Sequence, residues 1–162
     1  MTKKIIIDYG CGNIESIKRA FNKVDENFII SDDIKEISKA THLVLPGVGA
    51  FKNAADKLKQ HGFFEIIKKH SQNELPLLGI CLGMQLLFSK SFEFGENAGL
   101  DIFKGQVKKI KTSDSSKYKV PNIGWYSLEP NNLNEKNKLN IHMKSKFYHV
   151  HSFYCEPKEA EN

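Results

Sequence analysis

A cysteine between two glycines is the first feature of this 162-residue sequence that could do chemistry. The stretch LPLLGICLGMQLLF (75–88) begins as an apolar run, turns at Gly79-x-Cys81-x-Gly83 and becomes apolar again at helical spacing. This is the layout of a nucleophile elbow, in which the two glycines let a strained turn pass close to its neighbours. The alternative interpretation is that Cys81 is a small buried hydrophobic residue, as free cysteines often are.

The elbow interpretation predicts a nucleophile for acyl transfer. Cys81 would stand at the carboxyl end of a sheet, where open α/β folds bind ligands. It would also precede a helix, whose dipole favours a negatively charged sulfur, and thiolate is the attacking form of cysteine. Cys11 lies in a glycine-flanked turn and Cys155 at a strand end, so both are predicted to be packing residues.

Short apolar runs that alternate with helical patterns must position this corner. We expect strands within residues 3–10, 27–31, 41–47 and 75–80, and helices within residues 13–24, 31–40, 53–70 and 82–90. Asn13 can cap the first helix, and Gly62 breaks the third. This alternation predicts an α/β fold with an open, mostly parallel, doubly wound sheet and helices on both faces.

After about residue 92 the pattern changes to strands without long helices between them. Strands are expected within residues 99–110, 122–130 and 146–157, as an antiparallel extension of the parallel core. The segments TSDSSKYK (112–119) and NNLNEKNK (131–138) are predicted loops. No linker is visible, so we predict a single domain over residues 1–162.

Composition excludes several classes of function. The formal net charge is +5, but the lysines are scattered and no arginine-rich stripe indicates nucleic-acid binding. No apolar run approaches the roughly 20 residues of a membrane span, and the N-terminus lacks the apolar core of a signal peptide. Three cysteines without paired spacing argue against a disulfide framework or a metal site, and a cytoplasmic location is expected.

Five segments together resemble the class I (triad-type) glutamine amidotransferases. PLLGICLGMQLL (76–87) is similar to their nucleophile segment. The other four resemble one branch of the family, the glutaminase subunit of imidazole glycerol phosphate synthase, in the order of that branch: IIDYGCGNIESIKRAF (6–21), LVLPGVGAF (43–51), PNIGWYSL (121–128) and FYHVHSFY (147–154).

The resemblance implies hydrolysis of glutamine to glutamate and ammonia through a cysteine thioester, without cofactor or metal. Ammonia would pass to a (β/α)8-barrel synthase/cyclase subunit in a heterodimer. That partner makes imidazole glycerol phosphate and an aminoimidazole carboxamide ribotide (AICAR), in histidine biosynthesis. A lone tryptophan is more often a core residue, so Trp125 as a contact with this partner is weighed against plain packing.

The resemblance also assigns roles to individual residues. Cys81 matches the nucleophile, and the backbone of Leu82 and of the glycine loop Gly47, Val48 and Gly49 would stabilise the oxyanion; the alternative for the loop is a plain strand-to-helix turn. The residues that match the family's substrate contacts are Gln85, Glu93, His151, Ser152 and Phe153. Phe153 stands where the family often has tyrosine, so one hydroxyl is lost.

A cysteine amidase also needs a base, which the family carries in a C-terminal H-P-E segment. This sequence contains no such triplet; its histidines are His42, His61, His70, His142, His149 and His151. The resemblance therefore predicts a C-terminally truncated amidotransferase domain that lacks the catalytic histidine and glutamate. We expect little or no glutaminase activity from this chain alone.

Three functions stay open on the sequence. The first is the glutaminase subunit described above, of which this sequence would be a fragment or a frameshifted product. The second is a paralogue that feeds ammonia to a sugar-amidating synthetase in surface-glycan synthesis. The third is a non-catalytic subunit that only binds a barrel partner. Identification of the partner would distinguish them.

Overall fold

The computed structural model describes residues 2–24, 26–112, 119–128 and 145–158. The chain divides into a first compact unit, Met1–Lys108 with Cys155–Asn162, and a second one, Lys109–Tyr154. The predicted loop 131–138, most of the loop 112–119 and His142 lie outside the described residues. No helix in the described part is long and apolar enough to cross a membrane.

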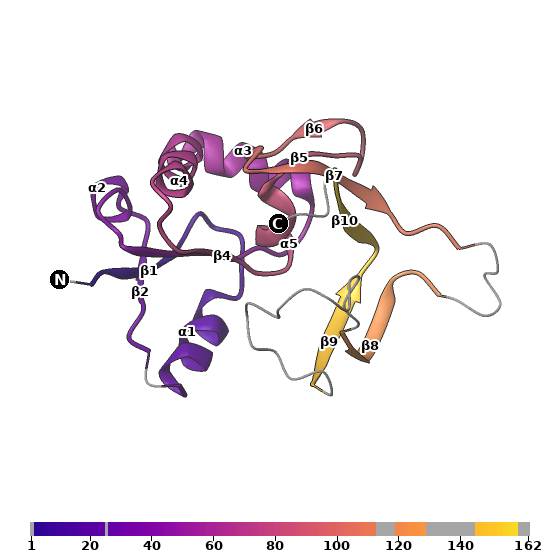
Figure 1. Ribbon diagram of the computed structural model, residues 1–162, viewed down its shortest axis with the longest axis horizontal. Coiled ribbons are helices and arrows are strands. Elements are labelled where there is room, and N and C mark those ends of the chain that lie inside the picture. The colour runs from indigo at the N-terminus through magenta and orange to yellow at the C-terminus, as the bar shows by residue number, and fades with distance from the viewer. Residues whose placement is uncertain (1, 25, 113–118, 129–144, 159–162) are drawn as a thin grey trace. The chain divides into compact units, whose positions relative to one another are not determined.

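Four parallel strands form the central sheet of the first unit, in the order β2-β1-β3-β4 (Figure 1). At the centre of this sheet, Ile6 pairs with Ile30 on one side and with Val44 on the other. The direction of winding reverses between β1 and β3, the place where open α/β sheets bind ligands. All four predicted strands are confirmed: β1 (Lys4–Ile7), β2 (Ile29–Ser31), β3 (His42–Leu45) and β4 (Leu77–Gly79).

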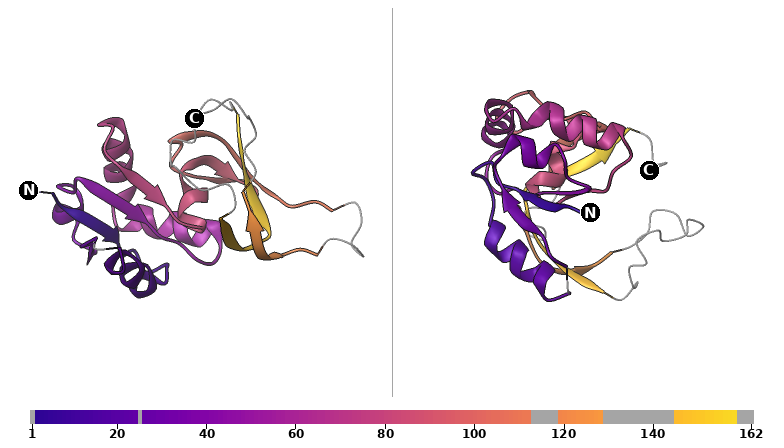
Figure 2. Two further views of the ribbon diagram at one scale, coloured as in Figure 1. Left: turned by 60° about the horizontal axis from the view of Figure 1, so that its bottom comes forward. Right: turned by 90° about the vertical axis from the view of Figure 1, so that its left-hand side faces the viewer.

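Helices cover both faces of this sheet, which confirms the doubly wound prediction (Figures 1 and 2). One face carries α1 (Ile14–Asn22), and the other carries α2 (Ile34–Ile37), α3 (Phe51–Gln60) and α4 (Phe63–Gln72). The predicted break at Gly62 is confirmed, because this residue has a φ of 70° between α3 and α4.

The first helix, α1, has less burial and weaker capping than the sequence pattern predicts. Asn13 occupies its N-cap position, but the side chain makes no capping hydrogen bond there. No residue of α1 is buried; Ile17 and Phe21 are partly buried against a cluster that includes Ile6 and Val44. One apolar side of α1 therefore remains open to a groove at the end of the sheet.

The helix expected over residues 82–90 is shorter than predicted. The structure has α5 (Leu82–Leu86), followed directly by β5 (Phe88–Ser91). The reason is tertiary: the carbonyl oxygens of Leu86 and Leu87 accept hydrogen bonds from the backbone N–H groups of Leu100 and Ile102, at 2.8 and 2.9 Å. These distant donors take the acceptors that another helical turn would have used.

The strands expected after residue 92 are present in the described part of the chain, but they belong to two sheets that are separate from the parallel one. A mixed sheet has the order β10-β7-β5-β6, in which β5 runs parallel to β7 and antiparallel to β6. The stretch 146–157, expected as one strand, divides at Ser152 into two strands that belong to different sheets. The strand bounds are β6 (Asn97–Ala98), β7 (Phe103–Lys109), β8 (Asn122–Ser127), β9 (Lys146–His151) and β10 (Phe153–Pro157).

A buried histidine ties α4 to the start of β4. His70 is 5% exposed, and its Nε2–H donates to the carbonyl oxygen of Pro76 at 3.0 Å. Burial lowers the pKa of His70, and the Pro76 hydrogen bond opposes this shift. The folded chain therefore holds the neutral form more strongly than the unfolded chain does.

The lowered pKa of His70 makes the stability of the first unit sensitive to acid. The contribution of His70 is complete above about pH 6.5, the pKa of an unfolded histidine, and is lost as the pH falls toward the lowered folded value. We expect the free energy of unfolding to fall more steeply below about pH 6.5 in the native chain than in His70→Gln. Urea unfolding at several pH values measures this, with the exposed His61→Gln as the control; parallel curves for His70→Gln and the native chain would contradict it.

Candidate active site

Cys81 occupies a strained corner between β4 and α5. Its backbone angles are φ 57° and ψ −117°, a region that residues other than glycine rarely adopt. Its side chain is exposed. A strained backbone that holds a thiol in the open agrees with the elbow interpretation rather than with a packing cysteine.

The two glycines of the motif are sterically required. A Cβ atom on Gly83 would stand 1.9 Å from the carbonyl oxygen of Leu45, and one on Gly79 would stand 2.6 Å from the Cα of Met84. Both are backbone atoms, which cannot relieve a clash by rotating away as a side chain can. The G-x-C-x-G spacing thus brings α5 against the ends of both β3 and β4.

The predicted oxyanion loop lies directly against this corner. A Cβ on Gly47 would meet the backbone nitrogen of Gly83 at 2.7 Å and the Cβ of Leu82 at 2.9 Å. Gly49 has a φ of 91° and nothing within 4 Å of a Cβ position, while Val48 is exposed. The loop is therefore tightly packed against α5 at Gly47. At Gly49 it has open space, where a peptide N–H could turn toward the sulfur.

The two predicted substrate contacts near the elbow lie on different elements. Gln85 is on α5, one turn after Cys81, and is half-buried. Glu93 follows β5 instead of continuing the helix, and its Oε2 accepts a hydrogen bond from the backbone N–H of Phe51 at 2.6 Å. Glu93 thereby caps the first residue of α3, so in this structure its carboxylate fixes the far end of the predicted oxyanion loop.

The other predicted substrate contacts belong to the second unit. His151 ends β9, and both of its ring nitrogens are engaged: Nδ1–H donates to the carbonyl oxygen of Phe153 at 2.8 Å, and Nε2 accepts from the Asn122 amide at 3.0 Å. The carbonyl of Ser152 accepts from the backbone N–H of Ile110 at 2.8 Å. Substrate roles for His151, Ser152 and Phe153 stay predictions.

The described histidines of the first unit make structural contacts. The Nδ1 atom of His42 lies 3.0 Å from the hydroxyl of Thr41, and the ring of His61 stacks on Phe63. His70 is bonded to Pro76. None of these three histidines lines the groove that contains Cys81.

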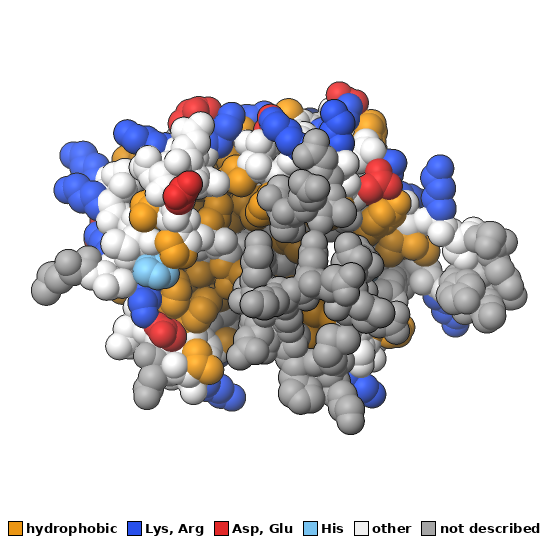
Figure 3. Space-filling model, viewed as in Figure 1, with side chains coloured by type: hydrophobic (Ala, Val, Ile, Leu, Met, Phe, Trp, Pro, Cys, Tyr) orange, Lys and Arg blue, Asp and Glu red, His pale blue; other side chains and the backbone are white. Residues whose placement is uncertain are grey.

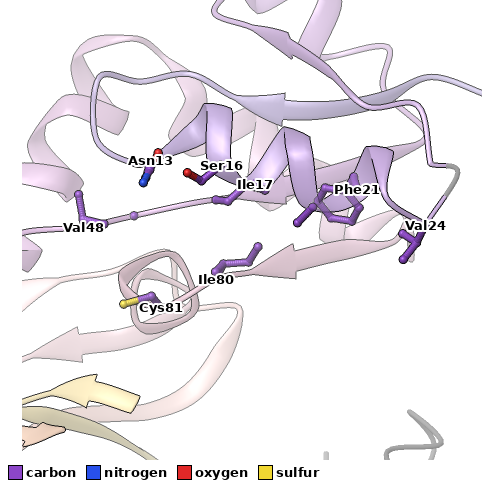
Figure 4. A pocket seen from close by; sticks show the side chains of 10 residues that line it. Asn13, Ser16, Ile17, Phe21, Val24, Val48, Ile80 and Cys81 are labelled. Carbon is purple, nitrogen blue, oxygen red and sulfur yellow. The ribbon is translucent and has the colours of Figure 1, made fainter. Parts of the chain in front are cut away.

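That groove, about 520 Å³ in volume, lies between α1 and the elbow (Figure 4). Ile17 and Phe21 line it from α1, and Ile80 points toward them from the end of β4. Its lining is mostly apolar, and hydrophobic side chains gather on the surface between α1 and β4 (Figure 3). The full lining is Asn13, Ser16, Ile17, Ala20, Phe21, Val24, Gly47, Val48, Ile80 and Cys81.

Sequence reasoning missed Tyr9, which lies behind the oxyanion loop. This residue follows β1, is 1% exposed, and donates its hydroxyl hydrogen to the carbonyl oxygen of Pro46 at 2.6 Å. The available signal was an aromatic residue that ends a buried strand just before the GCGN turn. Only the strand order shows that this strand end lies beside Pro46.

The strained cysteine, its two glycines and the facing glycine loop on a doubly wound sheet have the arrangement predicted for an elbow-type acyl-transfer site. The model for the family "Glutamine amidotransferase class-I" matches residues 5–162. The chain belongs to this family.

Several individual relatives are subunits of imidazole glycerol phosphate synthase. The chain is 41% identical to the "Imidazole glycerol phosphate synthase subunit HisH" of Lactococcus lactis, over 99% of this chain and 77% of that protein. It is 45% identical to subunit "HisH 2" of Methanococcus maripaludis, over 95% of this chain and 76% of that protein. A solved "glutamine amidotransferase" structure shares the fold, with a TM-score of 0.59 at 14% identity over 76% of this chain and 62% of that one.

Cys81 and Cys155 should differ sharply in reactivity. Cys81 is exposed, whereas burial raises the pKa of the Cys155 thiol to about 11, so its thiolate is scarce at neutral pH. We expect iodoacetamide at pH 8 to alkylate Cys81 more than about tenfold faster than Cys155. Peptide mass spectrometry over a time course measures both rates, and Cys81→Ser identifies the fast site. Equal rates at the two positions would contradict the presented-thiol geometry.

Proposed function

We propose that this chain is the glutamine-hydrolysing subunit of an imidazole glycerol phosphate synthase, and that it works in the cytoplasm. The observation that carries the proposal is the strained, exposed Cys81 facing the Gly47–Gly49 loop, in a chain 41–45% identical to HisH subunits. The three cysteines are free thiols, which supports a reducing compartment.

The reaction proceeds through a thioester on Cys81. The sulfur attacks the side-chain carbonyl carbon of glutamine, and the resulting oxyanion is stabilised by backbone N–H groups of the loop and of Leu82. The carbon–nitrogen bond then breaks. A general base, which none of the described residues lining the groove supplies, carries the thiol proton to the nitrogen, which leaves as ammonia. Water hydrolyses the thioester to glutamate and restores the free thiol.

The proposed substrate contacts come from the resemblance to the family. Gln85, one helical turn beyond Cys81, contacts the carboxylate end of glutamine, and the Glu93 carboxylate contacts its ammonium group. The resemblance to the family also assigns substrate contacts to His151, Ser152 and Phe153, and both ring nitrogens of His151 are engaged within the second unit. The released ammonia is used by a (β/α)8-barrel synthase subunit, which makes imidazole glycerol phosphate and AICAR.

The β8–β9 hairpin supports such a partnership. Trp125 pairs with Tyr148 and Ile123 pairs with Val150, so these four side chains share one face of the ribbon. All four are more than half exposed; Trp125 is 65% exposed. An exposed aromatic and aliphatic face of this kind is typical of the central part of a protein–protein interface.

Turnover with the partner tests the activity. The chain, expressed from its complete reading frame, is purified with the barrel subunit of the same host, and glutamate release from glutamine is measured with and without that partner. We expect the partner to stimulate release, and Cys81→Ser to abolish it while binding is retained. Release that survives Cys81→Ser would contradict the proposal, as would stimulation only by a sugar-amidating synthetase.

Partner affinity tests the hairpin surface. Trp125→Ala should weaken binding of the barrel subunit by more than about tenfold, because a central aromatic residue commonly contributes over about 2 kcal/mol. Tyr126→Ala, on the opposite face of the same ribbon, is the matched control and should have little effect. Calorimetric titration measures both, and native-like affinity in Trp125→Ala would exclude this face as the interface.

A further inference from the structure

The Tyr9 side chain links the ends of β1 and β3, the two central strands of the parallel sheet. Tyr9 follows β1, and Pro46 follows β3, the neighbouring parallel strand. The Tyr9 hydroxyl donates to the Pro46 carbonyl oxygen at 2.6 Å, in a buried position. This hydrogen bond therefore crosses the point at which the winding of the sheet reverses, next to Cys81.

The acceptor matters because it belongs to the first peptide unit of the oxyanion loop. The carbonyl oxygen of Pro46 and the N–H of Gly47 lie on opposite sides of one rigid, planar trans peptide. A hydrogen bond that fixes the oxygen also fixes the direction of that N–H. The Tyr9 hydroxyl would lie 3.0 Å from a Cβ on Gly47, so it also supports the loop directly.

The rest of the loop combines a fixed end with a free centre. Its far end is held where the N–H of Phe51 donates to Glu93 at 2.6 Å. Between the two anchors, Gly49 has a φ of 91° and open space around it. Rotation within the loop is thus confined to the peptides around Val48 and Gly49. The Tyr9 hydrogen bond fixes the Pro46–Gly47 peptide that precedes them.

The electrostatic surroundings keep Tyr9 a donor. Burial, with a smaller contribution from negative charge at Cys11 and Cys81, raises the pKa of Tyr9 far above its ordinary value. The phenol therefore stays protonated at every working pH. A neutral donor also adds no negative charge beside the Cys81 thiolate during attack.

We propose that Tyr9 is a positioning residue of the glutaminase site: its hydroxyl orients the Pro46–Gly47 peptide and thereby the loop amides that stabilise the oxyanion. The inference rests on the proposed function. Tyr9 does not touch the reacting atoms, so its effect on catalysis is indirect. It should be smaller than the 10²- to 10³-fold loss that follows removal of an oxyanion donor itself.

Tyr9→Phe tests this, because it removes one oxygen and keeps the ring. In the complex with the barrel subunit we expect kcat for glutamine hydrolysis to fall about tenfold with little change in KM, since the lost interaction acts mainly in the transition state. Alkylation of Cys81 by iodoacetamide, which forms no oxyanion, should keep its native rate. Tyr154→Phe, an exposed tyrosine, is the matched control.

Amide hydrogen exchange provides a readout that does not depend on turnover. In Tyr9→Phe, peptides that cover residues 46–50 should exchange faster, while those of β1 and β3 stay native-like. Unchanged exchange in the loop would overturn the inference, as would faster exchange with native kcat. A native complex without Cys81-dependent glutamate release would overturn the proposed function instead, and the exchange data would still decide whether Tyr9 orders the loop.

Discussion

The approach of α5 to the end of β3 is the contact on which the rest of the site depends. The Cα of Gly83 lies so close to the carbonyl of Leu45 that a single methyl group would collide with it. This contact is possible only because the chain reverses sharply at Cys81, whose φ of 57° is strained. The strain is held by the parallel pairing of β3 with β4, which brings Leu45 opposite Gly79. The register of β3 against β4 therefore also fixes the backbone geometry of Cys81.

The same contact positions the glycine loop Gly47–Gly49. Because β3 ends against α5, the next residues must pass over the first turn of that helix, and Gly47 fits there only without a side chain. Tyr9 supports the loop from the neighbouring strand end, and Glu93 holds the start of α3. Elements from four separate stretches of sequence thus meet at one edge of the sheet, as is typical of ligand sites in open α/β folds.

Much of this could be predicted from the sequence, because the relevant signals are local. The G-x-C-x-G spacing predicts the elbow, Gly62 predicts the break between α3 and α4, and short apolar runs predict the four parallel strands. The end of α5 could not be predicted, since the donors that end it, Leu100 and Ile102, are distant in sequence. The Tyr9 hydrogen bond and the capping contact of Glu93 are likewise tertiary, so no periodicity indicates them.

Acylation of Cys81 by glutamine tests the central claim most directly. The complex is incubated with isotopically labelled glutamine and quenched in acid, and the cysteine-containing peptides are analysed by mass spectrometry. The account predicts a labelled γ-glutamyl group on Cys81 that hydroxylamine removes, and none on Cys11 or Cys155. Labelled glutamate that appears without acylation of Cys81, or a label carried by another residue, would contradict it.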